Sequence, residues 1–155
     1  MRKRSLAILA LILTVAAWPA RASGGDEAAL KARLRDAWAG WASLDTSRPA
    51  PFYAKDPGLV FYDLAPLQYT GWKEYAAGVQ KNFFDQASSM TFAFKDEPAV
   101  TRRGKVAWTM VTVHLSLAMK NGQKLELDAR HTAVWEKRGG QWLIVHEHTS
   151  APLPG

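Results

Sequence analysis

Two histidines near the C-terminal end stand two residues apart, in the segment VHEHTSAPLPG. If this segment is a strand, His146 and His148 lie on one face, because side chains alternate along a strand. Such a pair can bind zinc or relay a proton, and it can also pack outside a pocket with no chemical role. The chain has no cysteine that could complete a zinc site. A third histidine or a carboxylate could complete it, but we expect no metal site. We also expect no cofactor, because the sequence has no phosphate-loop or dinucleotide-binding motif.

Asp63 is the first candidate for a catalytic group. It ends a strand predicted over residues 59–63 and precedes the loop LAPLQYTG. In an apolar cavity a carboxylate favours its neutral form, which raises its pKa towards values that suit a general base. The alternative is that Asp63 only makes local hydrogen bonds at the start of the loop, as aspartates often do there.

Three further side chains could assist Asp63. His131 lies on the apolar side of its predicted strand and could act as an acid or a hydrogen-bond donor, or it could be a buried core histidine. The same two interpretations apply to His114. Glu147 would be a carboxylate beside these histidines, a pairing that shifts the pKa of both groups, or it could form a cross-strand ion pair.

An aromatic, mostly apolar pocket is predicted between a helix and the long strands. Its predicted lining consists of Trp72, Tyr75, Phe83, Trp108, Met110, His114 and Glu147. A pocket of this kind suits a flat apolar ligand. The simpler interpretation is that the aromatic residues form the core of the domain.

The periodicity of the apolar residues changes along the chain. Spacings of three and four predict helices over residues 26–44 and 72–87, whereas alternation predicts strands over 90–94, 106–120, 125–136 and 142–150. Helices followed by hairpin-connected strands indicate the α+β class. Because two helices can cover only one face of such a sheet, the apolar residues on the other face predict a homodimer through the sheet.

The pairing of the last two strands decides which side chains face inward. A three-residue RGG turn pairs Thr132 with His146, whereas a two-residue Gly-Gly turn would place His131 against His148. We prefer the first register because it turns the apolar side of the partner strand inward. It directs the His146–His148 pair to the outer face. The residues that it turns inward are Leu127, Ala133, Val145, Glu147 and Thr149.

Residues 1–22 have the pattern of a secretory signal peptide, with basic residues, the apolar run SLAILALILTVAAW, and small residues at Ala20 and Ala22. The run is shorter than the ~20 residues of a membrane-spanning helix, although an uncleaved anchor is the alternative. Cleavage after Ala22 would remove four basic residues and lower the formal net charge from +6 to +2. The remaining charge gives no sign of nucleic-acid binding. We expect a periplasmic or secreted protein with no membrane attachment after cleavage.

The segments DPGLVFYD and HTAVWEKRGGQWLIVHEHTSAP resemble the nuclear transport factor 2-like superfamily. The similarity is to its SnoaL-like branch and to the association (hub) domain of calcium/calmodulin-dependent protein kinase II. It implies one domain over residues 23–155, with a cone-shaped, curved antiparallel sheet and N-terminal helices closing a central cavity. Steroid isomerases of this superfamily carry a carboxylate base at the place of Asp63. The kinase hub has arginines in its cavity, and Met110, Ala133 and Thr149 stand in their places here, which argues against a small acidic ligand.

The resemblance leaves the function open, because the superfamily includes isomerases, dehydratases, cyclases and binding or assembly modules. The first expectation is an exported domain that binds a small apolar molecule of unknown identity. The second is an enzyme of the isomerase, dehydratase or cyclase type, with Asp63 as general base and His131 as its partner. The third is an oligomerisation module whose cavity has no role.

Overall fold

The structure is a computed structural model, and it describes residues 23–152. The predicted signal peptide lies outside the described residues. The elements, in chain order, are α1 (Ser23–Ala42), the 3₁₀ helix η1 (Ala50–Phe52), β1 (Val60–Tyr62), β2 (Tyr69–Thr70), α2 (Gly71–Asn82), the 3₁₀ helix η2 (Phe84–Gln86), β3 (Ala87–Phe94), β4 (Ala99–Arg103), β5 (Val106–Met119), β6 (Lys124–Arg138) and β7 (Gln141–Ser150).

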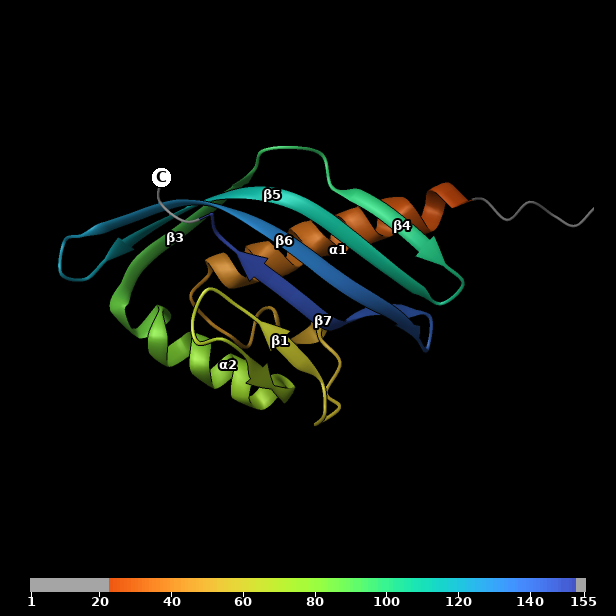
Figure 1. The fold of residues 1–155 in the computed structure, drawn as a ribbon, viewed down its shortest axis with the longest axis horizontal. Helices are drawn as coiled ribbons and strands as arrows, with labels where there is room; N and C mark the ends of the chain where they lie inside the picture. Colours follow the sequence, from red (N-terminus) through yellow and green to blue (C-terminus); the bar gives the residue numbers. More distant parts are fainter. Residues whose placement is uncertain (1–22, 153–155) are drawn as a thin grey trace, which may run out of the picture.

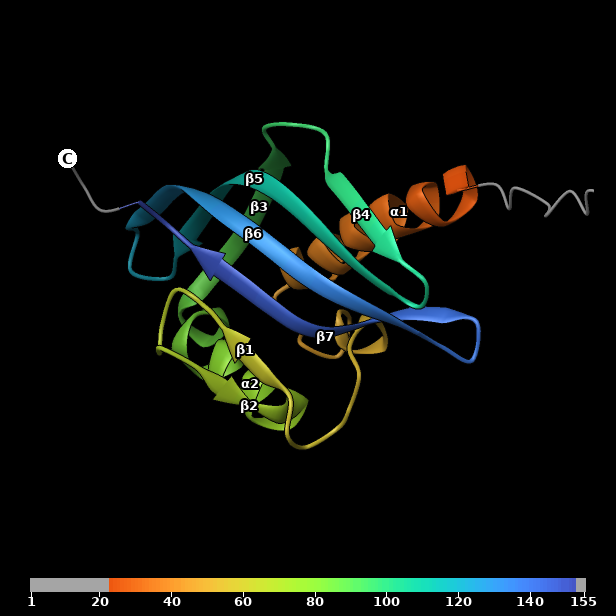
Figure 2. The ribbon, with the colours of Figure 1, turned by 45° about the vertical axis from the view of Figure 1, so that its right-hand side comes forward.

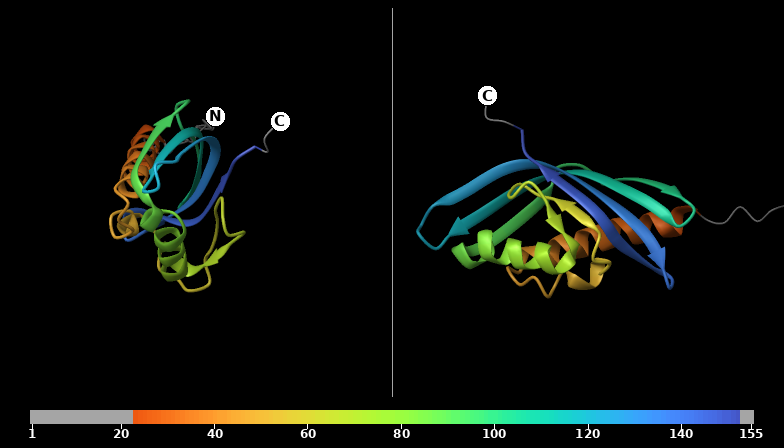
Figure 3. Two further views of the ribbon diagram at one scale, coloured as in Figure 1. Left: turned by 90° about the vertical axis from the view of Figure 1, so that its left-hand side faces the viewer. Right: turned by 60° about the horizontal axis from the view of Figure 1, so that its bottom comes forward.

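The seven strands form one curved sheet, in the order β2-β1-β7-β6-β5-β3, with β4 beside β5. Both long helices lie on the concave side of this sheet (Figures 1 and 3). Helix α1 packs against β3, β4 and β5, whereas α2 packs against β1 and β2 at the other end (Figure 2). The predicted α+β class and the curved sheet are confirmed. One pair departs from the antiparallel expectation, because β1 runs parallel to β7.

The core lies between the concave face and the helices. Strand β5 alternates in burial from Ala107 to Leu117, as its sequence predicts, with every second side chain turned inward. A polar pair is built into this core, where the indole nitrogen of Trp135 donates a 2.9 Å hydrogen bond to the Thr109 hydroxyl. Both residues have no exposed surface, so this hydrogen bond satisfies two polar groups that water cannot reach.

The hairpin between β6 and β7 differs from the predicted register in two ways, and together they shift the pairing by two residues, so that Thr132 pairs with His148 instead of His146. Gly139 and Gly140 form a two-residue turn between Arg138 and Gln141, and both glycines have positive φ, at 54° and 84°. Such a turn requires glycine-like freedom at both positions. A bulge then shifts the pairing between Val134 and Trp135, so that one extra residue is inserted in β7. The predicted RGG turn is therefore wrong.

The side chains of β6 nevertheless point to the faces of the sheet that the sequence predicts. Because the bulge restores the parity that the shorter turn changes, Ala133 pairs with Glu147 and Thr132 pairs with His148. Leu127 and Ala133 lie on the concave side, as predicted. Val145, predicted to face inward, lies at the bulge, and its neighbour Ile144 is fully buried in its place.

Three elements also differ from the prediction. Strand β4 was not predicted from the sequence, and only Gly104 and Lys105 lie between β4 and β5. Helix α2 ends five residues before the predicted limit, and η2 follows it. Strand β2 lies in the predicted loop. Within residues 23–152, no helix is both long and apolar enough to cross a membrane.

Candidate functional site

A pocket with a cavity of about 70 Å³, partly open to solvent, lies between the concave face of the sheet and the two helices. Its walls are mostly apolar, and its polar groups gather where β1 meets β7. The lining residues are Trp38, Trp41, Asp63, Leu64, Tyr75, Val79, Phe83, Phe84, Met90, Leu115, Leu117, Leu125, Leu127, His131, Glu147 and Thr149. A cavity of this size is smaller than most small-molecule sites in proteins, so a larger ligand requires the lining side chains to move apart.

Glu147 is the centre of a buried hydrogen-bond network in this pocket. One carboxylate oxygen accepts a 2.6 Å hydrogen bond from the Tyr53 hydroxyl, and the other accepts one from the Tyr75 hydroxyl. The indole nitrogen of Trp41 donates to the Tyr53 hydroxyl at 2.8 Å, which orients that hydroxyl towards the carboxylate. The His131 Nε2 lies 3.4 Å from the same oxygen that Tyr53 reaches. Side chains from α2, from β6 and from the segment after η1 therefore meet at one carboxylate of β7.

This network keeps Glu147 ionised although only 2% of its surface is exposed. Burial by itself would raise the pKa of Glu147, but the hydrogen bond with His131, together with those from the two tyrosine hydroxyls, outweighs burial and lowers the pKa. The same arrangement acts in the opposite direction on the tyrosines. Burial and the neighbouring carboxylates raise the pKa of Tyr53 and Tyr75 well above the usual value, so both remain hydrogen-bond donors.

Asp63 lines the pocket, one residue past the end of β1. One carboxylate oxygen accepts a 2.7 Å hydrogen bond from the backbone N–H of Leu64, which is the local contact that the alternative interpretation expects. Burial raises the pKa of Asp63 to about 6, and the negative charge of Glu147 adds to this effect. The side chain is half-buried and lines the pocket, so it combines the local role with a position that a ligand can reach.

His131 lies on the concave face of β6, across from Thr149 on β7. Its ring meets the edge of Trp38, with 5.2 Å between the ring centres. Only 4% of the residue is exposed. Its Nε2 faces Glu147, whereas its Nδ1 is buried and has no hydrogen-bond partner among residues 23–152. His131 and Asp63 line the same pocket, which is the arrangement that the sequence predicts for the pair.

The predicted ligand-contacting residues separate into two groups. Tyr75, Phe83 and Glu147 line the pocket. Trp72 does not reach it, and instead stacks on Tyr53 with 4.5 Å between ring centres, so it supports the network from behind. The ammonium group of Lys55 lies over the Trp72 ring, 3.9 Å from its centre.

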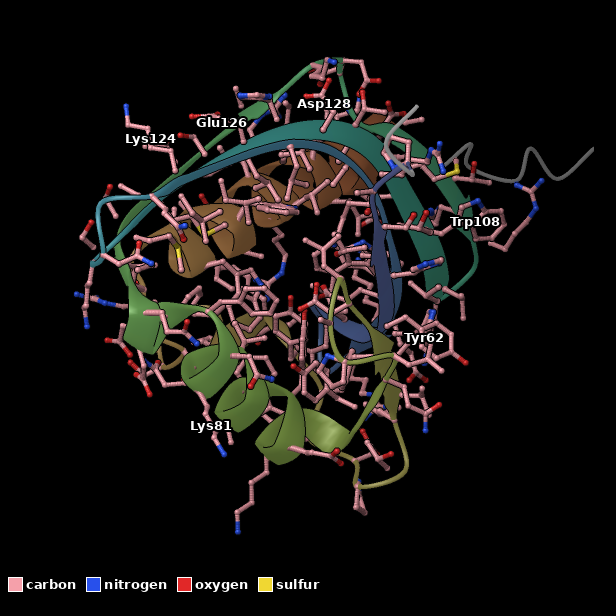
Figure 4. All side chains as sticks on the ribbon, turned by 60° about the vertical axis from the view of Figure 1, so that its left-hand side comes forward. Tyr62, Lys81, Trp108, Lys124, Glu126 and Asp128 are labelled. Carbon is pink, nitrogen blue, oxygen red and sulfur yellow. The ribbon has the colours of Figure 1, made fainter. Side chains whose placement is uncertain are left out.

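Trp108, Met110 and His114 lie on the outer, convex face of β5, and their predicted place in the pocket is wrong. They alternate with the buried residues of that strand, and Met110 is 40% exposed. Figure 4 shows Trp108, Glu126 and Asp128 pointing away from the space between sheet and helices. The sequence did not show which side of β5 faces inward, because both sides carry apolar residues.

The two histidines of β7 also lie on the outer face. Both rings meet Tyr62 edge to face, at 5.3 Å for His146 and 5.7 Å for His148. The His146 Nδ1 donates to the Val60 carbonyl oxygen at 2.7 Å. Within residues 23–152, no group of three or more His, Asp or Glu side chains is placed to hold a metal ion.

Two residues of the network escaped the sequence analysis, namely Tyr53 and Trp41. Tyr53 follows η1 in a proline-rich connection and reaches the sheet through an isolated bridge to Ile144. No local sequence pattern predicts this contact. Trp41 lies on the apolar stripe of α1, where it looks like an ordinary core residue. Their indole and hydroxyl groups were the only available signal, because buried Trp and Tyr usually need a hydrogen-bond partner.

A family model described as "SnoaL-like domain" matches residues 32–154, so the chain belongs to the SnoaL-like family. Solved structures agree on the fold. A nuclear transport factor 2-like superfamily protein from Salmonella enterica serovar Typhimurium is similar at 21% identity with a TM-score of 0.72, over 83% of this chain and 94% of that chain. A search of curated proteins gives no significant match.

Two further structures with different descriptions share this fold. A putative calcium/calmodulin-dependent protein kinase II association domain from Xanthomonas campestris is 25% identical with a TM-score of 0.69, over 90% of this chain and 95% of that chain. A putative dehydratase from Streptomyces avermitilis is 12% identical with a TM-score of 0.72, over 84% and 98%. The fold therefore includes proteins described as enzymes and as association domains, and the site has to decide the function.

Proposed function

We propose that the protein binds a small, mostly apolar molecule in the pocket between the sheet and the helices. The observation that carries this proposal is the composition of the walls, where leucines of β5 and β6 face aromatic residues of α1 and α2 around a few polar groups at one end. Burying an apolar ligand surface there is favourable by about 25 cal/mol per Å². The polar end would fix the orientation of the ligand.

Filling the pocket tests this proposal. Met90 lines the pocket on β3 and is only partly buried, so Met90→Trp adds volume inside the cavity with limited strain in the core. We expect this variant to bind a flat apolar probe such as 2-methoxynaphthalene at least about tenfold more weakly in calorimetric titration. Val106→Trp places the same side chain on the exposed end of β5, and it serves as the control. Equal affinity of both variants and the wild type would contradict binding in this pocket.

A second candidate function is a proton-transfer enzyme of the isomerase, dehydratase or cyclase type, with Asp63 as base. The pKa of about 6 at a position lining the pocket favours it, because such a carboxylate is ionised at neutral pH yet basic enough to accept a proton. Turnover would rise with pH through about 6. Asp63→Asn would abolish turnover and leave binding in place, whereas unchanged turnover would exclude this role.

We propose that the protein forms a homodimer through the convex face of the sheet. Tyr62 and Met110 are each 40% exposed there, and relatives of this fold include association domains. In sedimentation velocity we expect Met110→Glu to convert the dimer to a monomer. Leu67→Glu, in an exposed loop off the sheet, should leave it a dimer. An assembly larger than a dimer, without ligand binding, would favour the oligomerisation module instead.

The proposal also includes export, with cleavage after Ala22 releasing residues 23–155 as one domain. The family match begins at residue 32, which leaves the N-terminal segment outside the conserved domain. The intact mass of the protein isolated from the periplasm or the medium would then correspond to a chain that begins at Ser23. A mass that retains residues 1–22 would indicate the uncleaved anchor.

A further inference from the structure

The acidic and imidazole side chains that line the pocket are two carboxyl groups and one imidazole. Asp63, Glu147 and His131 provide them, and no lysine or arginine is among the lining residues. An anionic ligand would meet like charge at the polar end and no compensating cation, which disfavours it strongly in a desolvated space. The pocket therefore selects against carboxylates and phosphates.

The hydrogen-bond inventory at the polar end consists mainly of acceptors. Both oxygens of Glu147 are already occupied by donors, from Tyr53 and Tyr75. One oxygen of Asp63 is occupied by the Leu64 N–H. The open positions are the second oxygen of Asp63, the Thr149 hydroxyl and the Nδ1 atom of His131.

Glu147 determines what His131 can offer. The ionised carboxylate can only accept, so the ring nitrogen that faces it, Nε2, carries the hydrogen. In the neutral imidazole the other nitrogen then holds a lone pair. The Nδ1 atom is thus a buried acceptor without a donor, and leaving such a group unpaired is unfavourable. Because neighbouring side chains cover Nδ1, a ligand group that reaches it requires those side chains to move while the ring keeps its contact with Glu147.

We propose that the pocket selects a neutral, largely apolar molecule that carries a hydroxyl group, and that His131 Nδ1 accepts the hydrogen bond from this hydroxyl. This inference rests on the proposed binding function and names the class of ligand. Glu147 acts as a positioning residue, since it holds the imidazole in the tautomer that accepts. The Trp38 edge and the apolar walls fix the ring and the body of the ligand.

Three probes of nearly equal shape test the proposal, namely 2-naphthol, 2-methoxynaphthalene and 2-naphthoate. At neutral pH we expect 2-naphthol to bind about tenfold more tightly than the ether, the size of one good hydrogen bond. The carboxylate should bind at least about tenfold more weakly than the ether. Calorimetric titration of the purified protein gives all three affinities.

Two glutamine variants locate the effect. His131→Gln keeps an amide N–H near the position of Nε2, facing Glu147, and removes the Nδ1 acceptor, so the preference for naphthol over the ether should disappear. His114→Gln makes the same change on the outer face and should keep the preference. If His131→Gln does not fold, ¹⁵N chemical shifts of the wild-type imidazole decide, because they separate a lone-pair nitrogen from one that carries hydrogen. We expect the lone pair on Nδ1.

The outcomes distinguish the two levels of the proposal. If none of the probes binds, the proposed binding function fails, and this inference fails with it. If naphthol and the ether bind equally well, the binding function stands and the role of His131 is overturned. Tight binding of 2-naphthoate, or an imidazolium with hydrogen on both nitrogens, would likewise overturn the assignment of a neutral donor ligand.

Discussion

The two faces of the same sheet carry similar chemical groups in opposite surroundings. On the concave face, His131 and Glu147 meet in a space with almost no exposed surface. On the convex face, His114 contacts both Glu126 and Asp128, at 3.0 and 2.8 Å, with all three side chains about half exposed. The convex cluster has the shorter contacts, yet water screens it. Contact distance alone is therefore a poor guide to how much a histidine–carboxylate pair contributes.

The pKa shifts differ between the faces in the same way. Burial raises the pKa of Asp63 on the concave side to about 6. The hydrogen bond from Lys95, followed by that from His114, lowers the pKa of Asp128 on the convex side. One carboxyl group is thus easier to protonate than a free aspartate and the other is harder, because desolvation dominates inside and hydrogen-bonded cations dominate outside.

The largest difference in the free energy of unfolding should come from removing one carboxylate that contacts the histidine on each face. These carboxylates are Glu147 on the concave face and Glu126 on the convex face. Glu147→Ala leaves the Tyr53 and Tyr75 hydroxyls buried without an acceptor, and should lower the free energy of unfolding by about 3–5 kcal/mol. Glu126→Ala should leave the midpoint of urea unfolding nearly unchanged. Similar midpoints for both variants would mean that the concave network contributes no more than surface charge.

A second comparison uses the tryptophans of the two faces. Trp135→Phe removes the donor to Thr109 and leaves its hydroxyl unpaired in the core, so we expect a loss of about 2 kcal/mol in the free energy of unfolding. Trp108→Phe changes a half-exposed side chain on the convex face and should have little effect on the monomer. Urea denaturation of both variants under conditions that keep the protein monomeric separates this effect from dimer formation.

A third test uses pH. The folded pKa of Asp63, about 6, lies above the ordinary value of 3.8. Between these values the unfolded chain has released the proton and the folded chain retains it, so this group makes folding less favourable as pH rises from about 4 to 6. Asp63→Asn should therefore be stabilised relative to wild type at pH 7.5, by on the order of 1 kcal/mol, and not at pH 3.5. A stabilisation that is equal at both pH values would contradict a raised pKa.

The smallest effect is expected at His114. Its hydrogen bonds to Asp128 and Glu126 raise its pKa, so the imidazolium stabilises the fold at acid pH and this stabilisation disappears as pH rises through the folded pKa. The urea midpoint of His114→Gln should fall slightly below that of wild type at pH 5.5 and low salt. The difference should vanish at about 0.5 M salt, where screening of exposed charges is strong. A difference that resists salt would mean that the cluster is more buried than it is in this structure.

The sequence predicts the fold better than the site. Alternation along β5 and β6 is strict enough to predict the sheet, and the inward facing of Leu127 and Ala133 follows from the polarity of their neighbours. The exact pairing does not follow, because a bulge has no local signature, and here it compensated for a turn of the wrong length. Tyr53 was missed since its contact with Glu147 joins residues 94 positions apart. Such contacts depend on the path of a loop rather than on any period in the sequence.

Strand β1 joins the first part of the chain to its last strand, with Phe61 beside Glu147 and Tyr62 beside His148. Asp63 obtains its position from this junction. During synthesis the polar end of the pocket therefore cannot assemble until almost the whole chain has left the ribosome. A chain that lacks its final strand has neither the pairing partner of β1 nor Glu147, so the polar end of the pocket cannot form before β7 is present.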